Sequence, residues 1–114
     1  MDLITDASTK DVIGGVTENY EKLFEALSPS LYKYNNEPTD KRIHIGLVAE
    51  DMFNAMKPLG FTKETFCPYV AEVEAGNNIT GVNPTEMIVL NTHMIQRCIQ
   101  RIKQLENEIA ELKK

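Results

Sequence analysis

The sequence predicts an α+β protein in which a small mixed α/β domain precedes a long C-terminal helix that forms a parallel trimeric coiled coil. Two observations lead to this prediction. Apolar residues recur with heptad spacing through the last third of the chain, and short helical and strand-like patterns alternate before it. We place the small domain at residues 1–82 and the coiled-coil helix at residues 83–114.

An amphipathic helix is predicted near the start of the chain. Residues 1–15 are polar and close on two glycines, after which Thr17 fits a helix N-cap. Apolar side chains then recur at helical spacing over residues 20–27. We expect this helix to end at Ser28-Pro29, because the residue before a proline disfavours helical geometry.

Two short strands and a second helix follow. Residues 31–34 have a strand pattern, and the turn-rich loop 35–40 connects them to the strongly strand-like segment 42–48. Residues 49–56 then switch to helical spacing, and a proline and a glycine soon afterwards end that helix. We therefore expect a strand–loop–strand unit that leads directly into a short helix.

The rest of the small domain predicts a β-hairpin. Residues 61–66 carry no core pattern and fit a linker or a short helical turn. Residues 69–73 form a strand candidate, and the turn-forming run 76–78 leads into a second strand at 79–82. Helical and strand patterns thus alternate through a small mixed domain.

The last third of the chain predicts one capped helix with a heptad seam. Asn83-Pro84-Thr85-Glu86 combines a preferred N-cap, a proline suited to the first helical position and a glutamate that can close a capping box. Sustained apolarity at positions a and d is typical of a coiled coil, whereas a core-facing helix needs a third apolar row. Position a holds Ile88, Ile95, Ile102 and Ile109, and position d holds Asn91, Cys98, Leu105 and Leu112.

Charges beside the seam match a parallel, in-register assembly. Arg101 at position g precedes Glu106 at the following e, and Glu108 and Lys113 form the next such pair. Residues 101–106 also resemble the arginine–aliphatic–glutamate pattern of short parallel trimeric coiled coils. We therefore expect three strands. The alternative is an amphipathic helix packed on its own domain.

Composition argues against several classes of partner. The chain has 114 residues and a net charge of −5, whereas nucleic-acid binding usually needs a basic face. No apolar run reaches the length of a membrane span, and no signal peptide is evident. We expect neither nucleic acid nor a membrane as a partner. Oligomerisation would supply burial that so small a domain lacks.

The two cysteines do not make a disulfide framework. Cys98 falls at position d, where a reduced thiol behaves as a small hydrophobe. A zinc site from Cys67, Cys98, His44 and His93 is conceivable, but none of their spacings is that of a metal motif. We expect no metal and no cofactor.

A family resemblance appears at His44-Ile45-Gly46-Leu47-Val48-Ala49-Glu50-Asp51-Met52. This run resembles the H-x-G-[FL]-[IV]-A-[QE]-[ED]-[VM] core of the endosialidase-type intramolecular chaperone, also called the S74 peptidase domain. The segments 23–34 and 82–87 resemble that family's flanking motifs, in the same order. Nearly the whole chain is covered by this ordered set.

The resemblance implies a trimeric chaperone at the C-terminal end of a phage tail spike, tail fibre or neck appendage. Such a domain registers three chains while the upstream fibre segment folds, and then releases itself by a single self-cleavage of serine–lysine type. Its partners would be two further copies and the upstream segment of its own polypeptide. It would act in the host cytoplasm during virion assembly and be absent from the mature virion.

The resemblance also implies a cleavage junction near the N-terminus. The family's signature is Ser-Asp-x-x-x-Lys, in which Ser is the nucleophile and Lys the proposed base. In one register, Thr5-Asp6-Ala7-Ser8-Thr9-Lys10 keeps the spacing with Thr in place of Ser. In the other, Met1-Asp2 marks the junction and Lys10 requires a four-residue insertion. The second register, which we favour, would make this chain the released product.

Three polar residues are candidates for the cleavage chemistry. Lys10 is the base in both registers, since a lysine can accept a proton once burial or a nearby cation lowers its pKa. Its alternative is a solvated tail charge. His44 alternates with two isoleucines on its strand and could position the junction or relay a proton, or simply be a structural histidine. Glu50 could orient His44 or Lys10, or face solvent.

Three functions therefore compete. The first is a self-cleaving trimeric chaperone. The second is a non-catalytic trimerisation and capping module of a fibre, for which Thr or Met in place of the nucleophilic Ser would be natural. The third is a cytosolic coiled-coil adaptor. Scission in the presence of the upstream segment separates the first two, and oligomeric mass separates both from a monomeric or dimeric adaptor.

Overall fold

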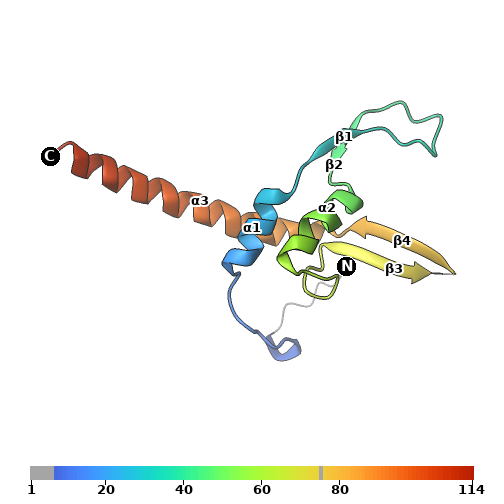
Figure 1. The fold of residues 1–114 in the computed structure, drawn as a ribbon, viewed down its shortest axis with the longest axis horizontal. Helices are drawn as coiled ribbons and strands as arrows, with labels where there is room; N and C mark the ends of the chain where they lie inside the picture. The colour runs from blue at the N-terminus through green and yellow to red at the C-terminus, as the bar shows by residue number, and fades with distance from the viewer. Residues whose placement is uncertain (1–6, 75) are drawn as a thin grey trace. The chain divides into compact units, whose positions relative to one another are not determined.

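Helices and strands alternate along the chain, as the sequence patterns predict. The structure, a computed structural model, describes residues 7–74 and 76–114. The mixed α/β class with a long C-terminal helix is confirmed (Figure 1). In chain order the elements are η1 (Ala7–Thr9), α1 (Glu18–Ala26), β1 (Ser30–Tyr32), β2 (His44–Gly46), α2 (Ala49–Met56), η2 (Lys57–Leu59), β3 (Tyr69–Glu74), β4 (Asn77–Val82) and α3 (Pro84–Leu112).

The chain divides into two compact units. One comprises residues 17–84, and the other comprises residues 85–114 together with the N-terminal residues up to Val16. This division follows compactness alone. The functional boundary expected after Val82 stays a prediction.

The two short helices of the 17–84 unit have the predicted bounds. Thr17 is the N-cap of α1, and Leu27 ends it with an extended backbone just before Ser28-Pro29. Val48 is the N-cap of α2, so the strand-like segment gives way to helix one residue later. Gly60 follows η2 with φ near +78°, a left-handed conformation that glycine adopts without strain and that turns the chain away from the helix.

The strands form two separate antiparallel hairpins. β1 pairs with β2, with Tyr32 opposite His44, and β3 pairs with β4 over six residues each. The β2 strand is shorter than the segment 42–48 that the sequence suggested. β4 begins at Asn77 rather than after a turn at 76–78, and Gly76 precedes it with φ near +80°.

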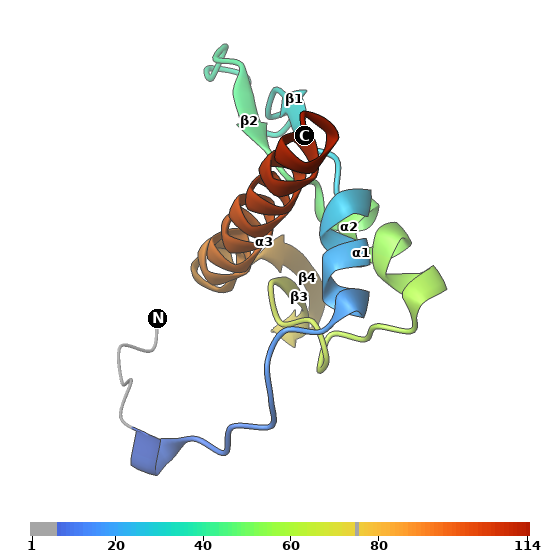
Figure 2. The same cartoon turned by 90° about the vertical axis from the view of Figure 1, so that its left-hand side faces the viewer.

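A small apolar core holds the 17–84 unit together. Helices α1 and α2 lie side by side in both ribbon views (Figures 1 and 2). Aromatic packing adds to this core, since the Tyr20 and Phe61 rings meet edge to face with centroids 4.7 Å apart. The Tyr20 hydroxyl donates a hydrogen bond to the Thr65 carbonyl at 2.6 Å. The buried hydrophobic side chains of this unit are Leu23, Met52, Met56, Phe61 and Phe66.

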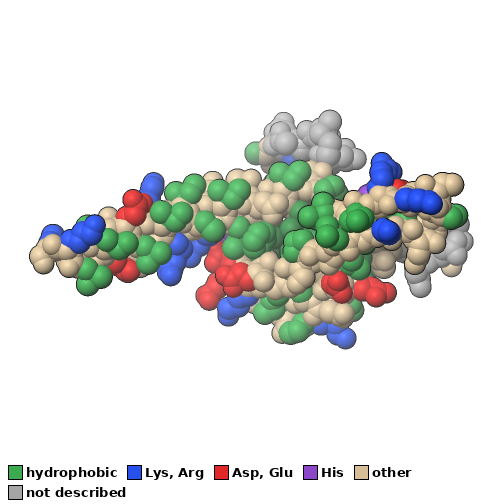
Figure 3. Space-filling view, turned by 90° about the horizontal axis from the view of Figure 1, so that it is seen from above, with side chains coloured by type: hydrophobic (Ala, Val, Ile, Leu, Met, Phe, Trp, Pro, Cys, Tyr) green, Lys and Arg blue, Asp and Glu red, His purple; other side chains and the backbone are tan. Residues whose placement is uncertain are grey.

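Helix α3 begins at Pro84, where the sequence placed it, and runs for 29 residues. From Ile95 to the end of the helix, every residue is exposed in a single chain. Hydrophobic side chains follow the length of the helix face that is visible in Figure 3. A helix with an exposed apolar row is unfavourable in water, so α3 has a face that is suited to a partner.

Truncating the core should destabilise the protein strongly. Leu23 is fully buried in α1, so Leu23→Ala removes apolar contacts and leaves a cavity. We expect a loss of about 2–5 kcal/mol in the free energy of unfolding. Denaturant titration at fixed protein concentration, followed by circular dichroism, measures this loss.

Leu31→Ala is the matched control. Leu31 is 71% exposed, so the same chemical change should cost only about 0.5 kcal/mol or less. Equal losses for the two variants would show that the packing of α1 does not form the core described above.

Candidate functional site

The two faces of the β1–β2 hairpin carry different kinds of side chain. Leu31 lies opposite Ile45, and both side chains are exposed on one face. Tyr32 lies opposite His44 on the other face, which is better covered. A Cβ on Gly46 would lie 3.4 Å from the Tyr32 ring, so the glycine leaves room for that ring beside His44. The predicted alternation of His44 with its neighbouring isoleucines is therefore confirmed.

Two tyrosine rings enclose the His44 imidazole. The Tyr32 ring stacks on it at 5.5 Å between centroids, and the Tyr34 ring meets it edge to face at 4.8 Å. The two tyrosine rings also contact each other, at 5.4 Å. As a result, the His44 side chain is only 24% exposed although it lies on a two-stranded sheet.

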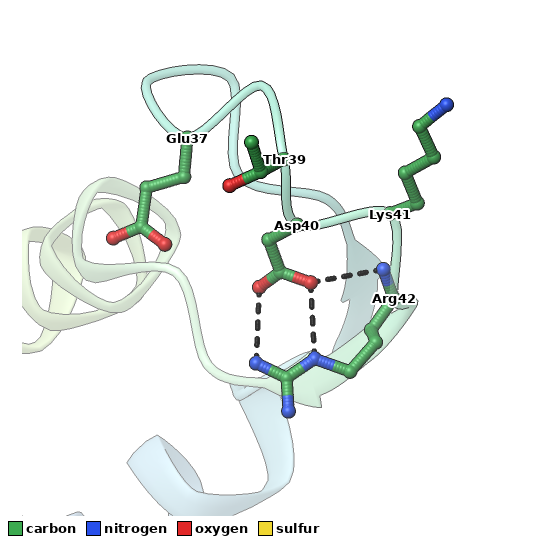
Figure 4. A pocket seen from close by; sticks show the side chains of 5 residues that line it. All are labelled: Glu37, Thr39, Asp40, Lys41 and Arg42. Carbon is green, nitrogen blue, oxygen red and sulfur yellow. Dashed lines mark hydrogen bonds and ion pairs between the residues drawn. The ribbon is translucent and has the colours of Figure 1, made fainter.

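Asp40 links the loop before β2 to the histidine. Its carboxylate accepts hydrogen bonds from the Arg42 backbone N–H and Nε at 3.0 Å each and from Arg42 Nη2 at 3.3 Å (Figure 4). Asp40 Oδ2, the oxygen that accepts from Arg42 Nη2, also lies 3.0 Å from His44 Nε2. The Asp40 side chain is only 8% exposed, so it is a covered carboxylate with four polar contacts.

These contacts keep Asp40 ionised. Hydrogen bonds from the Arg42 side chain, then from the Arg42 backbone, then from His44 hold the pKa of Asp40 well below its usual range. Reciprocally, the Asp40 carboxylate raises the pKa of Arg42. The pKa of Tyr34 is raised, chiefly because its hydroxyl is hydrogen-bonded to Tyr32. The cluster therefore places one fixed negative charge against an imidazole nitrogen.

A surface pocket opens beside this cluster. Asp40 and Arg42 face each other across it, whereas the Lys41 side chain points away (Figure 4). Both signs of charge line the pocket, so it is suited to a polar group that can donate and accept hydrogen bonds. Its lining residues are Glu37, Thr39, Asp40, Lys41 and Arg42.

The predicted base, Lys10, directly follows η1. Its backbone N–H donates to the Ala7 carbonyl at 3.2 Å, and its ammonium lies 3.5 Å from the Thr9 hydroxyl. The side chain is exposed in a single chain. Both predicted junctions, Met1-Asp2 and Thr5-Asp6, lie outside the described residues. The structure groups Lys10 with the N-terminal residues and α3, whereas His44 belongs to the 17–84 unit.

Glu50 lies in the first turn of α2 and is exposed. Within the described part of the chain, no ion pair joins it to His44. Asp40 holds His44 instead, a contact that the sequence patterns did not predict. The available signal was an aspartate four residues before a strand histidine, preceded by two tyrosines at alternating positions.

The predicted interface residues of α3 share one property, which is exposure. The isoleucines of position a are between 51% and 63% exposed, and the other members of the set are exposed as well. The set comprises Ile88, Ile95, Cys98, Arg101, Ile102, Leu105, Glu106, Ile109 and Leu112. Its side chains are available to a second chain.

Metal-binding groups and membrane-spanning helices are both absent from the described residues. No group of three His, Cys, Asp or Glu side chains in residues 7–74 and 76–114 is arranged to hold a metal ion. Within those ranges, no helix has the length and apolarity needed to cross a membrane.

Comparison with known families identifies the segment that contains this cluster. Residues 6–61 match the model of the S74 peptidase family, described as the chaperone of endosialidase. No curated protein matches the chain. The matched segment contains Lys10, α1, the β1–β2 hairpin and α2, so the resemblance seen around His44 is confirmed. The chain therefore carries a domain of the endosialidase-chaperone family, which is in general a family of self-cleaving peptidases.

Proposed function

We propose that this chain is the C-terminal intramolecular chaperone of a fibrous phage protein such as a tail spike, tail fibre or neck appendage. It forms a parallel homotrimer, holds three upstream chains in register while they fold, and then cuts itself free. The family match over residues 6–61 is the observation that carries this proposal. The exposed heptad row of α3 supports the trimer.

Trimerisation follows from the unpartnered seam. An isolated helix is only marginally stable in water, because its first turn fixes several residues for a single hydrogen bond and its apolar side chains stay in contact with solvent. Parallel association in register would bury the four isoleucines at position a and bring Arg101 close to Glu106 of a neighbouring chain. Because association supplies this burial, folding of α3 and trimerisation form one event.

Self-cleavage is an acyl transfer at the N-terminal junction. A hydroxyl oxygen attacks the junction carbonyl while Lys10 accepts the hydroxyl proton, and Lys10 then gives that proton to the leaving nitrogen as the C–N bond breaks. Water hydrolyses the resulting ester to a carboxylate and regenerates the hydroxyl. A lysine serves as the base only when burial or a nearby cation lowers its pKa. Lys10 is exposed in the single chain, so contacts formed on assembly would supply that burial. Cleavage would then wait for the trimer.

The biological setting follows from this mechanism. Each chain cuts once, so the activity is a single-turnover event and the released domain is a by-product. The partners are two further copies and the upstream fibre segment of the same polypeptide. The events take place in the host cytoplasm during virion assembly, and the domain is absent from the mature virion. Neither nucleic acid nor a membrane has a role in this proposal.

A second candidate function is a trimerisation and capping module that does not cut. One sequence feature favours it. The nucleophile position holds Thr5 in one register and Met1 in the other, whereas the family has Ser. The cleavage experiment below decides between the two functions.

Breaking the seam should dissociate the assembly. Ile102 occupies a central a position, so Ile102→Asp would place three carboxylates in one core layer, where they cannot all be paired. Sedimentation equilibrium at micromolar concentration should give a trimer for the unaltered chain and the monomer mass of 12.9 kDa for the variant.

Asn107→Asp is the control, because position f faces away from the seam and the new charge stays in solvent. It should remain trimeric. A mass of 12.9 kDa for the unaltered chain across the concentration range would rule out the trimer. A trimeric Ile102→Asp variant would show that the seam is misplaced.

Restoring the upstream segment should restore scission. A chain that carries its native upstream segment and junction residue should cut itself in the 1–6 region without added protease. Lys10→Ala should slow the cut by about 100-fold or more, the usual contribution of a positioned base. Lys10→Arg should block it too, because a guanidinium stays protonated. Intact-mass spectrometry over time measures each rate.

Lys22→Ala removes a different exposed lysine, one that pairs only weakly with Glu18, and should cut at the unaltered rate. Normal scission in Lys10→Ala would remove lysine from the mechanism. The absence of any scission in the extended, unaltered chain would favour the non-catalytic module. Scission in monomeric Ile102→Asp would separate proteolysis from assembly.

A further inference from the structure

The a positions of α3 are identical in every heptad of the seam. Isoleucine occupies position a in four successive heptads, and these side chains are between 51% and 63% exposed in a single chain. A chain that slides by seven residues along its neighbours would again place isoleucine against isoleucine in every a layer that remains. The isoleucines can therefore hold three chains together, but they cannot decide which heptads face each other.

The charges beside the seam distinguish one register from another only weakly. Arg101 would face Glu106 of a neighbour in an aligned trimer, whereas a slip of seven residues would bring Glu108 beside Glu106. These side chains are exposed in the single chain, and exposed charge pairs contribute little and are screened by salt. A strong preference for one register therefore needs a determinant inside the seam.

Asn91 is the polar exception among the seam positions. It occupies the d layer between Ile88 and Ile95, whereas the other three d layers hold one cysteine and two leucines. Its side chain is exposed, and among the described residues its amide makes no hydrogen bond. Burying an amide without partners is costly, so three chains that enclose Asn91 must satisfy its hydrogen bonds among themselves.

We propose that Asn91 sets the register of the trimer: the three Asn91 amides meet in one layer and hydrogen-bond to each other only when the chains are aligned residue for residue. An asparagine amide both donates and accepts, so three of them around a three-fold axis can close a ring of hydrogen bonds. After a slip of seven residues, Asn91 would lie level with Cys98 of a neighbour, whose thiol is a weak donor and a weak acceptor. This role rests on the proposed trimer, and it names the residue on which alignment of the upstream chains depends.

Replacing the amide should stabilise the assembly. Asn91→Leu places the usual apolar residue in this d layer, so the thermal midpoint at fixed protein concentration should rise by about 5 °C or more. Asn107→Leu is the matched control, because it makes the same chemical change at position f, away from the seam. Its midpoint should change by less than about 2 °C. Thermal unfolding followed by circular dichroism measures both.

Disulfide exchange between two versions of the chain reports the register. Both versions carry Cys67→Ser; the first keeps Cys98, and the second carries Cys98→Ser with Leu105→Cys, one heptad further on. A disulfide needs closely spaced Cα atoms, so it forms only between cysteines in the same layer. Disulfides between like chains therefore report alignment, and mixed disulfides report a slip of seven residues.

The ratio of these disulfides gives the expected result. An equimolar mixture is equilibrated in a glutathione redox buffer with about 0.5 M salt, which screens the exposed charge pairs. Like disulfides should exceed mixed ones by about tenfold or more while Asn91 is present. The ratio should fall by about fivefold or more when both versions carry Asn91→Leu, and Asn107→Leu should leave it unchanged. Mass spectrometry without reductant counts the products.

The outcomes keep this role apart from the proposed function. A trimer with the same disulfide ratio before and after Asn91→Leu overturns the register role and leaves the trimer standing. A midpoint that does not rise in Asn91→Leu overturns the role as well, since Asn91 would then not occupy a buried apolar layer. A monomer mass for the unaltered chain at every concentration overturns the proposed trimer, and the register role with it.

Discussion

Scarcity of burial is the constraint on which the rest of this molecule depends. The 17–84 unit buries five hydrophobic side chains among its described residues, and these come from α1, α2 and the segment that follows η2. A domain of this size is near the lower limit of independent stability. In helix α3 apolar side chains are plentiful but unburied, because its isoleucines and leucines are exposed over most of its length. Self-association would add buried apolar area to the small chain and would cover the exposed face of α3.

The same constraint gives a physical reason to couple folding with cleavage. An exposed lysine is a poor base, and Lys10 is exposed in the single chain. By contrast, the Asp40–His44 pair is already formed within one hairpin, anchored by Arg42 and enclosed by tyrosines. The hairpin cluster is therefore pre-organised within one chain, whereas burial of Lys10 would depend on assembly. Premature release of an unregistered chain would be avoided in this way.

The fold could be predicted from the sequence wherever the signal is local. Asn83-Pro84 marks the start of α3, Ser28-Pro29 the end of α1, and the spacing of residues 49–56 predicts α2. The errors concern strand limits. The β2 strand begins only at His44, after Arg42 has bonded to Asp40, and it ends before Val48, which caps α2. The Arg42–Asp40 hydrogen bond at one end and the helix cap at Val48 at the other thus override strand propensity.

The candidate site could be predicted only in part, for the same physical reason. His44 could be identified as a candidate because it is a polar residue in an apolar strand and belongs to the family motif. The contact between Asp40 and His44 requires the loop before β2 to fold back towards the strand, so that residues four positions apart meet. The enclosure of the His44 ring by tyrosines depends on the strand register that sets Tyr32 opposite His44. Pairing register is a non-local property, so a single sequence carries little information on it. The roles of Lys10 and Glu50 stay predictions.

Amide hydrogen exchange of residues 95–112 tests most directly whether α3 is held by other copies of this chain. Every residue in this range is exposed in a single chain, so no internal packing protects its amides. The account predicts slow exchange at high protein concentration and a loss of protection on dilution, as the assembly dissociates. Protection that does not change with concentration, or rapid exchange at every concentration, would contradict it.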